Sequence, residues 1–196
     1  MSNPIFTIGH SNHPIQSFIG LLAKYQIKIL ADVRSSPASR MNPQFNRVSL
    51  EASCNRSHIG YWFLGDGLGG KPKNMDCYID GQVQYNLIAQ TPAFKRSLVE
   101  LIEGADKYNI AIMCAEKDPL TCHRTIMVGR HLNLEGITTT HILANGQIET
   151  QQQAEDRLID ETRFPNFDPK MQREQLLEHA YVLRAQQMLR GLRKAG

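Results

Sequence analysis

The sequence has little net charge, few cysteines and no long apolar run. Its formal charge of +3 does not by itself indicate any partner. The cysteines show neither a disulfide-scaffold spacing nor a Cys-x-x-Cys pair, so we expect reduced thiols at Cys54, Cys77, Cys114 and Cys122. No stretch approaches the roughly 20 apolar residues of a membrane span. The N-terminal segment lacks the basic start of a signal peptide, and we therefore expect a cytoplasmic protein.

The remaining composition is that of an ordinary globular domain. The 196 residues are 41% hydrophobic and 21% charged, which suits one core with a terminal appendage. We expect an α/β core domain over residues 1–150, in which residues 76–90 are mostly helical. Residues 151–196 should form a helical extension that packs on the core or on a partner subunit, and the second case would make a homodimer. Residues 163–169 are typical of an irregular linker.

Short apolar runs separated by helix-like segments indicate a parallel sheet. Residues 5–8 and 29–33 are apolar and flank an amphipathic segment, which is the pattern of a right-handed βαβ unit. Residues 110–113 form a further buried strand. Asn145-Gly146 favours a two-residue hairpin, so residues 147–150 should return as an antiparallel edge strand. We predict a three-layer α/β sandwich with a mainly parallel sheet, this edge hairpin and C-terminal helices.

The strongest functional signal lies in residues 110–124. After the strand, Pro119 breaks the backbone and Thr121 suits the N-cap of a helix. Three reactive side chains would then lie on the first helical turn: Cys122, His123 and Arg124. Free N–H groups and the helix dipole favour anions at such a position and lower the pKa of a thiol. Cys114, at the strand end, is expected to be a small buried core residue.

Other polar residues follow the first two strands. His10 comes directly after the first strand, and Asp32 and Arg34 come at the end of the second. Because ligands bind beyond the carboxyl ends of the strands in open α/β sheets, we expect these side chains to face one crevice between neighbouring strands. Arg40 lies in a long Pro- and Ser-rich loop over residues 35–47, and loops of this kind are often functional.

Several motifs, in order along the chain, together resemble one family. They are Thr7-Ile-Gly-His10-Ser11, Asp32-Val-Arg34, Pro43-Gln-Phe45, Leu68-Gly69-Gly70 and Met113-Cys114-x-Glu116-x-Asp118-Pro119-x-x-Cys122-His123-Arg124. Over residues 5–143 the sequence resembles the uncharacterised bacterial family named domain of unknown function 488. The resemblance implies a compact α/β domain of the bacterial cytoplasm and no settled activity. It singles out eight polar residues: His10, Asp32, Arg34, Arg40, Glu116, Cys122, His123 and Arg124.

The favoured hypothesis is an enzyme that acts on a phosphate-bearing substrate, either a nucleotide or a nucleic acid. Guanidinium groups bind phosphate oxygens through charge-assisted hydrogen bonds. The substrate-binding residues would be His10, Arg34, Arg40, Thr121 and Arg124. Cys122 or His123 would act as nucleophile or general base, and Asp32 or Glu116 would orient that group or share its proton. No cofactor is expected, and a persulfide-carrying sulfur transferase is a variant of this hypothesis.

Two other functions stay open at this point. A nucleic-acid-binding accessory module would use the basic C-terminal helix, although no standard binding motif is present. The basic residues of that helix are Arg184, Arg190, Arg193 and Lys194. A metal site would combine a carboxylate with Cys122, His123 and His10. Adjacent Cys and His residues are poorly spaced for two ligands of one ion, so we predict no metal ligand.

Overall fold

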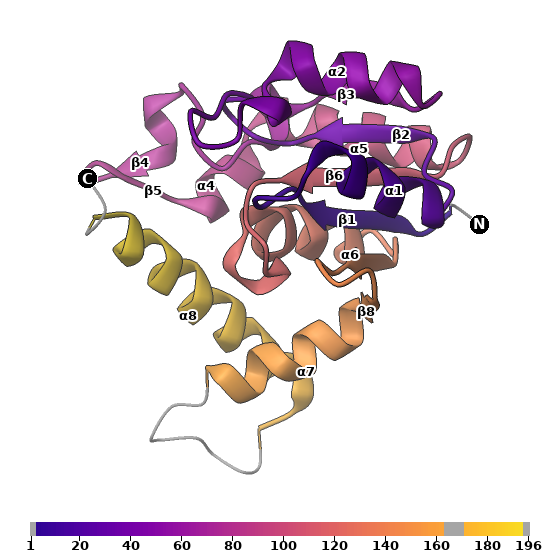
Figure 1. Cartoon of the computed structure of the whole chain (residues 1–196). Helices are drawn as coiled ribbons and strands as arrows, with labels where there is room; N and C mark the ends of the chain where they lie inside the picture. Colours follow the sequence, from indigo (N-terminus) through magenta and orange to yellow (C-terminus); the bar gives the residue numbers. More distant parts are fainter. Residues whose placement is uncertain (1–2, 163–170, 194–196) are drawn as a thin grey trace.

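A six-stranded, mostly parallel sheet forms the centre of the molecule (Figure 1). The structure is a computed structural model that describes residues 3–162 and 171–193. From edge to edge the strands are β3 (Gly60–Phe63), β2 (Ile29–Asp32), β6 (Ile110–Cys114), β1 (Ile5–Gly9), β7 (Thr139–Ile142) and β8 (Ile148–Thr150). The first five are parallel, and β8 pairs antiparallel with β7. The predicted α/β fold and its antiparallel edge are therefore confirmed.

β6 lies between β1 and β2, and all of its residues are buried. Thr7 of β1 and Ala31 of β2 both pair with Ile112 of β6, one from each side. The expectation that the first two strands are neighbours is therefore wrong. The apolarity of a strand shows that it is buried, but it does not encode the order of the strands.

Helices cover both faces of the sheet and complete three layers (Figure 1). One face carries α1 (Ile15–Lys24) and α2 (Arg47–Arg56), and the other carries α3 (Gly65–Leu68), α4 (Tyr85–Gln90), α5 (Pro92–Ala105) and α6 (Arg130–Leu134). Met113 joins the apolar cluster of α1 and α2, whereas Ile112 and Cys114 join the cluster of the opposite face. Successive residues of β6 thus face opposite layers, as the two-residue period of a strand requires.

The segment from residue 76 to 90 is only partly helical. It contains the two-stranded hairpin of β4 (Tyr78–Ile79) and β5 (Gln82–Val83), which follows the short 3₁₀ helix η2 (Met75–Cys77). The two turn residues, Asp80 and Gly81, have φ angles of 50° and 71°. Positive φ at both central positions is the requirement of a type I′ turn, for which Asp-Gly is a favoured pair. The prediction that residues 76–90 are mostly helical is therefore wrong. It followed the helical spacing of the apolar residues and did not use the turn signal of Asp80-Gly81.

The C-terminal extension packs on the core of its own chain (Figure 1). α7 (Gln151–Glu161) begins at a capping box formed by Thr150 and Gln153. α8 (Arg173–Arg193) buries Tyr181 in a third apolar cluster that includes Leu120 of the core and Leu158 of α7. The linker expected at residues 163–169 lies outside the described residues. None of the helices in the described ranges combines the length and apolarity needed to cross a membrane.

Candidate functional site

The carboxyl ends of β1 and β6 form the natural crevice of this sheet. The chain leaves β1 toward α1 and leaves β6 toward α6, and these helices lie on opposite faces. Above the strand ends the two loops meet, and the His10 N–H donates to the Cys114 carbonyl at 2.9 Å. Gly9 permits this approach, since a Cβ atom there would lie 1.9 Å from the Glu116 carbonyl oxygen. The loops after β1 and β6 are therefore in backbone contact directly above the strand ends.

The segment between β6 and α6 differs from the predicted helix start. It forms a 3₁₀ turn, η3 (Pro119–Thr121), and then a π-helical segment, η4 (Arg124–Gly129). Asp118 caps the turn, because its carboxylate accepts a backbone N–H at 2.9 Å. Thr121 is exposed, and its hydroxyl donates to the Asp118 carbonyl at 3.1 Å. The prediction that Thr121 caps the following helix is wrong, because Asp118-Pro119 initiates a separate turn that ends at Thr121.

Cys122 takes the capping position of the helix instead. Its backbone is extended, with φ −133° and ψ 138°, and its carbonyl accepts the Ile126 N–H at 3.1 Å. Its Sγ accepts the Arg124 N–H at 3.5 Å. An extended residue whose side chain accepts a first-turn N–H is in N-cap geometry. The sulfur thus lies at the positive end of the helix, where a thiolate is stabilised.

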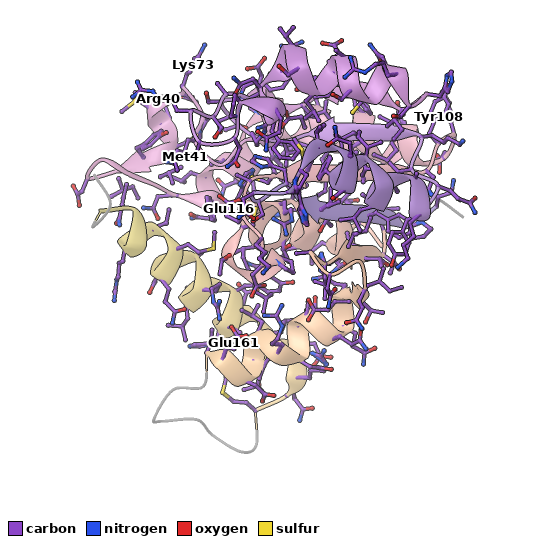
Figure 2. All side chains as sticks on the ribbon, viewed as in Figure 1. Arg40, Met41, Lys73, Tyr108, Glu116 and Glu161 are labelled. Atoms are coloured by element: carbon purple, nitrogen blue, oxygen red, sulfur yellow. The ribbon has the colours of Figure 1, made fainter. Side chains whose placement is uncertain are left out.

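Four side chains converge at this helix start and are called the thiol cluster: Cys114, Glu116, Cys122 and His123. Their sulfur, nitrogen and oxygen ligand atoms all lie within 4.8 Å of one another. The Cys122 thiol donates to Glu116 Oε2 at 2.8 Å, and Cys114 Sγ lies 3.6 Å from His123 Nδ1. The two thiols and the imidazole are buried, whereas Glu116 is exposed (Figure 2). Glu116 therefore connects the buried thiols with solvent.

The electrostatics of the thiol cluster favour one thiolate. Burial raises the pKa of Cys122, but a hydrogen bond from Cys114 and the positive charge of Arg124 outweigh burial and hold that pKa well below its usual value. The same hydrogen bond, together with burial, raises the pKa of Cys114. Burial and the adjacent Cys122 raise the pKa of Glu116. These shifts favour the thiolate of Cys122 over that of Cys114, and the interaction with Cys122 raises the pKa of His123 as well as that of Glu116.

Arg124 supplies a positive charge from inside the protein. Its side chain is 1% exposed, and its guanidinium donates to the Glu116 carbonyl at 2.7 Å and to the Thr7 hydroxyl at 3.4 Å. In the described part of the chain no carboxylate forms an ion pair with it. A buried guanidinium cannot lose its proton, and its positive charge favours the thiolate form of Cys122.

A second group, Asp32 and Arg34 with His10, lies beside the thiol cluster and is satisfied internally. Arg34 donates to both carboxylate oxygens of Asp32, at 2.9 and 2.6 Å, and the Tyr61 hydroxyl donates to the same carboxylate at 2.7 Å. His10 Nδ1 donates to the Ser11 carbonyl, which leaves Nε2 to accept from Arg34 at 3.3 Å. Burial lowers the pKa of His10 to about 4, so the ring is neutral. Neither charge of the Asp32–Arg34 pair is free for a ligand.

Arg40 stays apart from the buried groups. It is exposed, and Figure 2 shows it on the same side of the molecule as Glu116 and Lys73. A cavity of about 650 Å³ adjoins the strand ends and is lined by Ser11, His13, Lys117, Asp118, Asn145 and Arg157 among others. Of the predicted site residues, the structure thus brings together Cys122, His123, Glu116 and Arg124. His10, Asp32 and Arg34 lie in the adjoining group, and Arg40 and Thr121 lie at the surface.

Cys114 is the site residue that the sequence interpretation assigned to the core alone. It is buried, as expected, but it faces the thiol cluster. The period of β6 could have indicated this, because Cys114 shares the face of Ile112, on which the segment after Cys122 packs. The backbone of Gly70 packs on His123, since a Cβ atom at residue 70 would lie 2.9 Å from the ring. Two thiols, an imidazole and a carboxylate form a donor set that could hold a metal.

A buried chain of hydrogen bonds links the site to the C-terminal extension. Arg124 donates to the Thr7 hydroxyl, which lies 2.8 Å from His141 Nδ1. His141 Nε2 lies 3.1 Å from Gln151 Oε1, and the Gln151 amide donates to the Tyr181 hydroxyl at 2.8 Å. Each ring nitrogen of His141 has one partner, so the imidazole is neutral with its proton on Nε2. The side chain of Arg124 is thus positioned by groups that reach α7 and α8.

The fold and the site define an α/β protein with a buried thiol cluster at the carboxyl ends of its central strands. The chain belongs to the family described as Domain of unknown function DUF488, whose model matches residues 14–130. The match includes the whole thiol cluster and Arg124, whereas His10 precedes it. Comparisons with curated proteins and with solved structures found no match.

Proposed function

We propose that the chain is an enzyme that acts on a phosphate-bearing substrate, a nucleotide or a nucleic acid, with Cys122 as the nucleophile. The observation that carries this proposal is the 2.8 Å contact between Cys122 Sγ and Glu116 Oε2 at the capping position of a helix. A thiol beside a proton acceptor and a helix N-terminus has the features of an activated nucleophile. Glu116 takes the thiol proton, the Cys122 sulfur bonds to phosphorus as the bond to the leaving oxygen breaks, and Glu116 returns the proton to that oxygen. Water then cleaves the S–P bond and restores the thiol.

Other residues take positioning roles in this proposal. Arg124 stabilises the thiolate by its charge and is too deeply buried to be the main substrate contact. Arg34 holds the loop after β2, because its guanidinium donates both to the Asp32 carboxylate and to the backbone carbonyl of Phe45. The exposed cations Lys117 and Arg40 are then the candidates that meet the phosphate group. Lys117 also lines the cavity beside the strand ends.

A nucleic-acid-binding module without catalysis receives less support. Its basic handle would be α8, but Arg184 of that helix is paired with Glu161 at 2.6 Å and is 8% exposed. The side chains of Arg193 and Lys194 lie outside the described part of the chain. Because an already neutralised arginine releases no counterions on binding phosphate, its contribution to nucleic-acid affinity is small.

The test is alkylation of the metal-free protein by iodoacetamide near pH 7, with each thiol followed by peptide mass spectrometry. Cys54 is the internal control, because it and Cys122 are both 0% exposed. Burial raises the pKa of Cys54 to about 12, so it has almost no thiolate near pH 7. We expect Cys122 to react faster than Cys54, and phosphate or a nucleotide to slow it.

Activity is then measured on a panel of nucleotides and phosphate esters. Loss of turnover in Cys122→Ser is expected, with Cys54→Ser as the matched control. Glu116→Gln should lower the rate by roughly 10²–10⁴-fold, the usual contribution of general acid–base catalysis. If Cys122 reacts no faster than Cys54, or if Cys122→Ser keeps full activity, the thiolate mechanism is wrong.

A further inference from the structure

We propose that the thiol cluster is a binding site for one divalent cation of the zinc class. The ligands are the Sγ atoms of Cys114 and Cys122, Nδ1 of His123 and the carboxylate of Glu116, all within 4.8 Å of one another. Thiolate, imidazole and carboxylate are the ligands that zinc takes in four-coordinate protein sites. Three of these residues are buried and fixed, and Glu116 closes the site on the solvent side.

The local backbone removes the objection that adjacent residues cannot both bind one ion. Cys122 is extended, whereas His123 is helical with φ −60° and ψ −24°, so both side chains turn toward the same point. Cys114 takes the place that His10 had in the sequence-based hypothesis. The His10 ring cannot contribute, because both of its nitrogens are engaged by Ser11 and Arg34.

The distance between one pair of ligand atoms suits a tetrahedral site. Metal–ligand bonds of about 2.0–2.3 Å place neighbouring ligand atoms roughly 3.3–3.8 Å apart. Cys114 Sγ and His123 Nδ1 are 3.6 Å apart, within that range. Cys122 Sγ and Glu116 Oε2 are closer, at 2.8 Å, but the exposed Glu116 side chain can withdraw by rotation.

Neighbouring groups orient the ligands for metal binding. His123 Nε2 lies 3.0 Å from the Val33 carbonyl oxygen and donates to it, which directs the Nδ1 lone pair toward the sulfurs. Histidine ligands of metals almost always donate their second N–H in this way. The Arg124 backbone N–H donates to Cys122 Sγ, and the backbone of Gly70 packs against the His123 ring.

The charges also balance. Two thiolates and one carboxylate carry three negative charges, and a divalent cation leaves one of them uncompensated. The buried guanidinium of Arg124, which has no carboxylate partner in the described ranges, supplies the remaining positive charge. Bound metal would therefore make the interior of the site neutral, which is the favourable state for buried charges.

This inference adds a means of regulation to the proposed function. It rests on that function only for the expectation that bound metal suppresses the reaction of Cys122. A sulfur bound to the cation shares a lone pair with the metal and is a weaker nucleophile than the free thiolate, so metal occupancy should slow the reaction of Cys122. Metal binding itself requires no catalysis and can be measured separately.

The experiment uses the full-length protein, stripped by a chelator and titrated with Zn²⁺ against a chromophoric chelator, and then with Co²⁺. We expect one ion per chain and the absorption bands of tetrahedral cobalt with sulfur-to-cobalt charge transfer. Cys114→Ser and Cys122→Ser should each lower the affinity by at least the roughly 10–100-fold lost with an outer-shell partner. Cys54→Ser and Cys77→Ser, at buried thiols outside the cluster, should bind as the wild type does. Zn²⁺ should protect Cys114 and Cys122 from iodoacetamide.

Several results would overturn the site. They are an absence of tight binding, a cobalt spectrum without sulfur ligation, and an affinity that Cys114→Ser, Cys122→Ser or Glu116→Gln leaves unchanged. The wild-type cobalt spectrum needs no variant, so a misfolded variant does not obscure the answer. Failure to bind zinc would leave the thiolate mechanism intact, whereas activity confined to the zinc-bound form would overturn that mechanism and keep the metal site.

Discussion

The polar residues at this site form hydrogen bonds and ion pairs with one another. Three arginines were expected to bind substrate, but Arg34 is held by Asp32 and Arg124 is held by backbone carbonyls and Thr7. Of the three, only Arg40 is exposed.

The role of Asp32 can be tested by Asp32→Asn. The substitution leaves the Arg34 charge buried without its partner, and breaking a buried ion pair in this way costs about 3–5 kcal/mol. We expect a loss of that size in the free energy of unfolding, measured by urea denaturation. Asp80→Asn is the matched control, because Asp80 is exposed in a turn whose positive φ asparagine also adopts. Unchanged stability combined with lost activity would return Asp32 to a catalytic role.

At the scale of elements, the strands were predicted well, and so were the helix starts at Pro92 and Gln151, whereas the start predicted at Thr121 was not. The strands at 5–8, 29–33 and 110–113 are encoded by local apolar runs, and burial follows directly from them. The capping role of Cys122 depends on the turn at Asp118-Pro119, which competes with Thr121 for the helix start. Competition between two local signals is decided by tertiary contacts, which a single sequence does not contain.

His141 of β7, which contacts Gln151 of α7, predicts that the stability of the protein depends on pH. His141 is 0% exposed, and burial together with the charge of Arg124 lowers its pKa to about 3, against 6.5 for the unfolded chain. Above pH 6.5 both states hold a neutral ring, and the lowered pKa has no cost. As the pH falls below 6.5 the unfolded chain gains a proton that the folded chain does not. Stability should then decrease by up to about 1.4 kcal/mol per pH unit from this group alone.

The measurement is urea denaturation at pH 7, 6 and 5 for the wild type and His141→Asn. The variant should be less stable at pH 7, because it loses contacts to Thr7 and Gln151. Its stability should nevertheless fall less steeply with decreasing pH. His58→Asn, at an exposed position with positive φ, should keep the wild-type slope. Equal slopes in the wild type and His141→Asn would mean that His141 titrates normally in the folded protein.

At the scale of the whole molecule, the sequence predicted the layers but not which side chains meet across them. The thiol cluster combines the end of β6, the loop after it and the two residues before η4, so all of its members come from residues 114–123. That proximity in sequence made most of the site predictable. The partners that tune it, which include Val33, Thr7 and Gly70, come from distant segments and could only be found in the folded structure.

The last prediction concerns the C-terminal extension, which was expected to pack either on the core or on a second copy of the chain. Its apolar face is covered by the chain itself, since Tyr181 and Leu189 are buried, and among its described side chains Val182 is the main exposed apolar one. We therefore expect light scattering to give the mass of one chain for the full-length protein. A chain that ends at Thr150 should aggregate, because it uncovers Leu120 and Ile126.

A chain that ends at Arg190 is the control for this truncation, because it keeps the buried residues of α8 and should remain monomeric and soluble. Removal of residues 151–196 also takes Gln151 from His141, which leaves a buried imidazole N–H without its acceptor. The core that remains should therefore be less stable as well as less soluble. A full-length dimer whose mass halves on truncation at Thr150, with unchanged solubility, would instead identify α8 as a subunit interface.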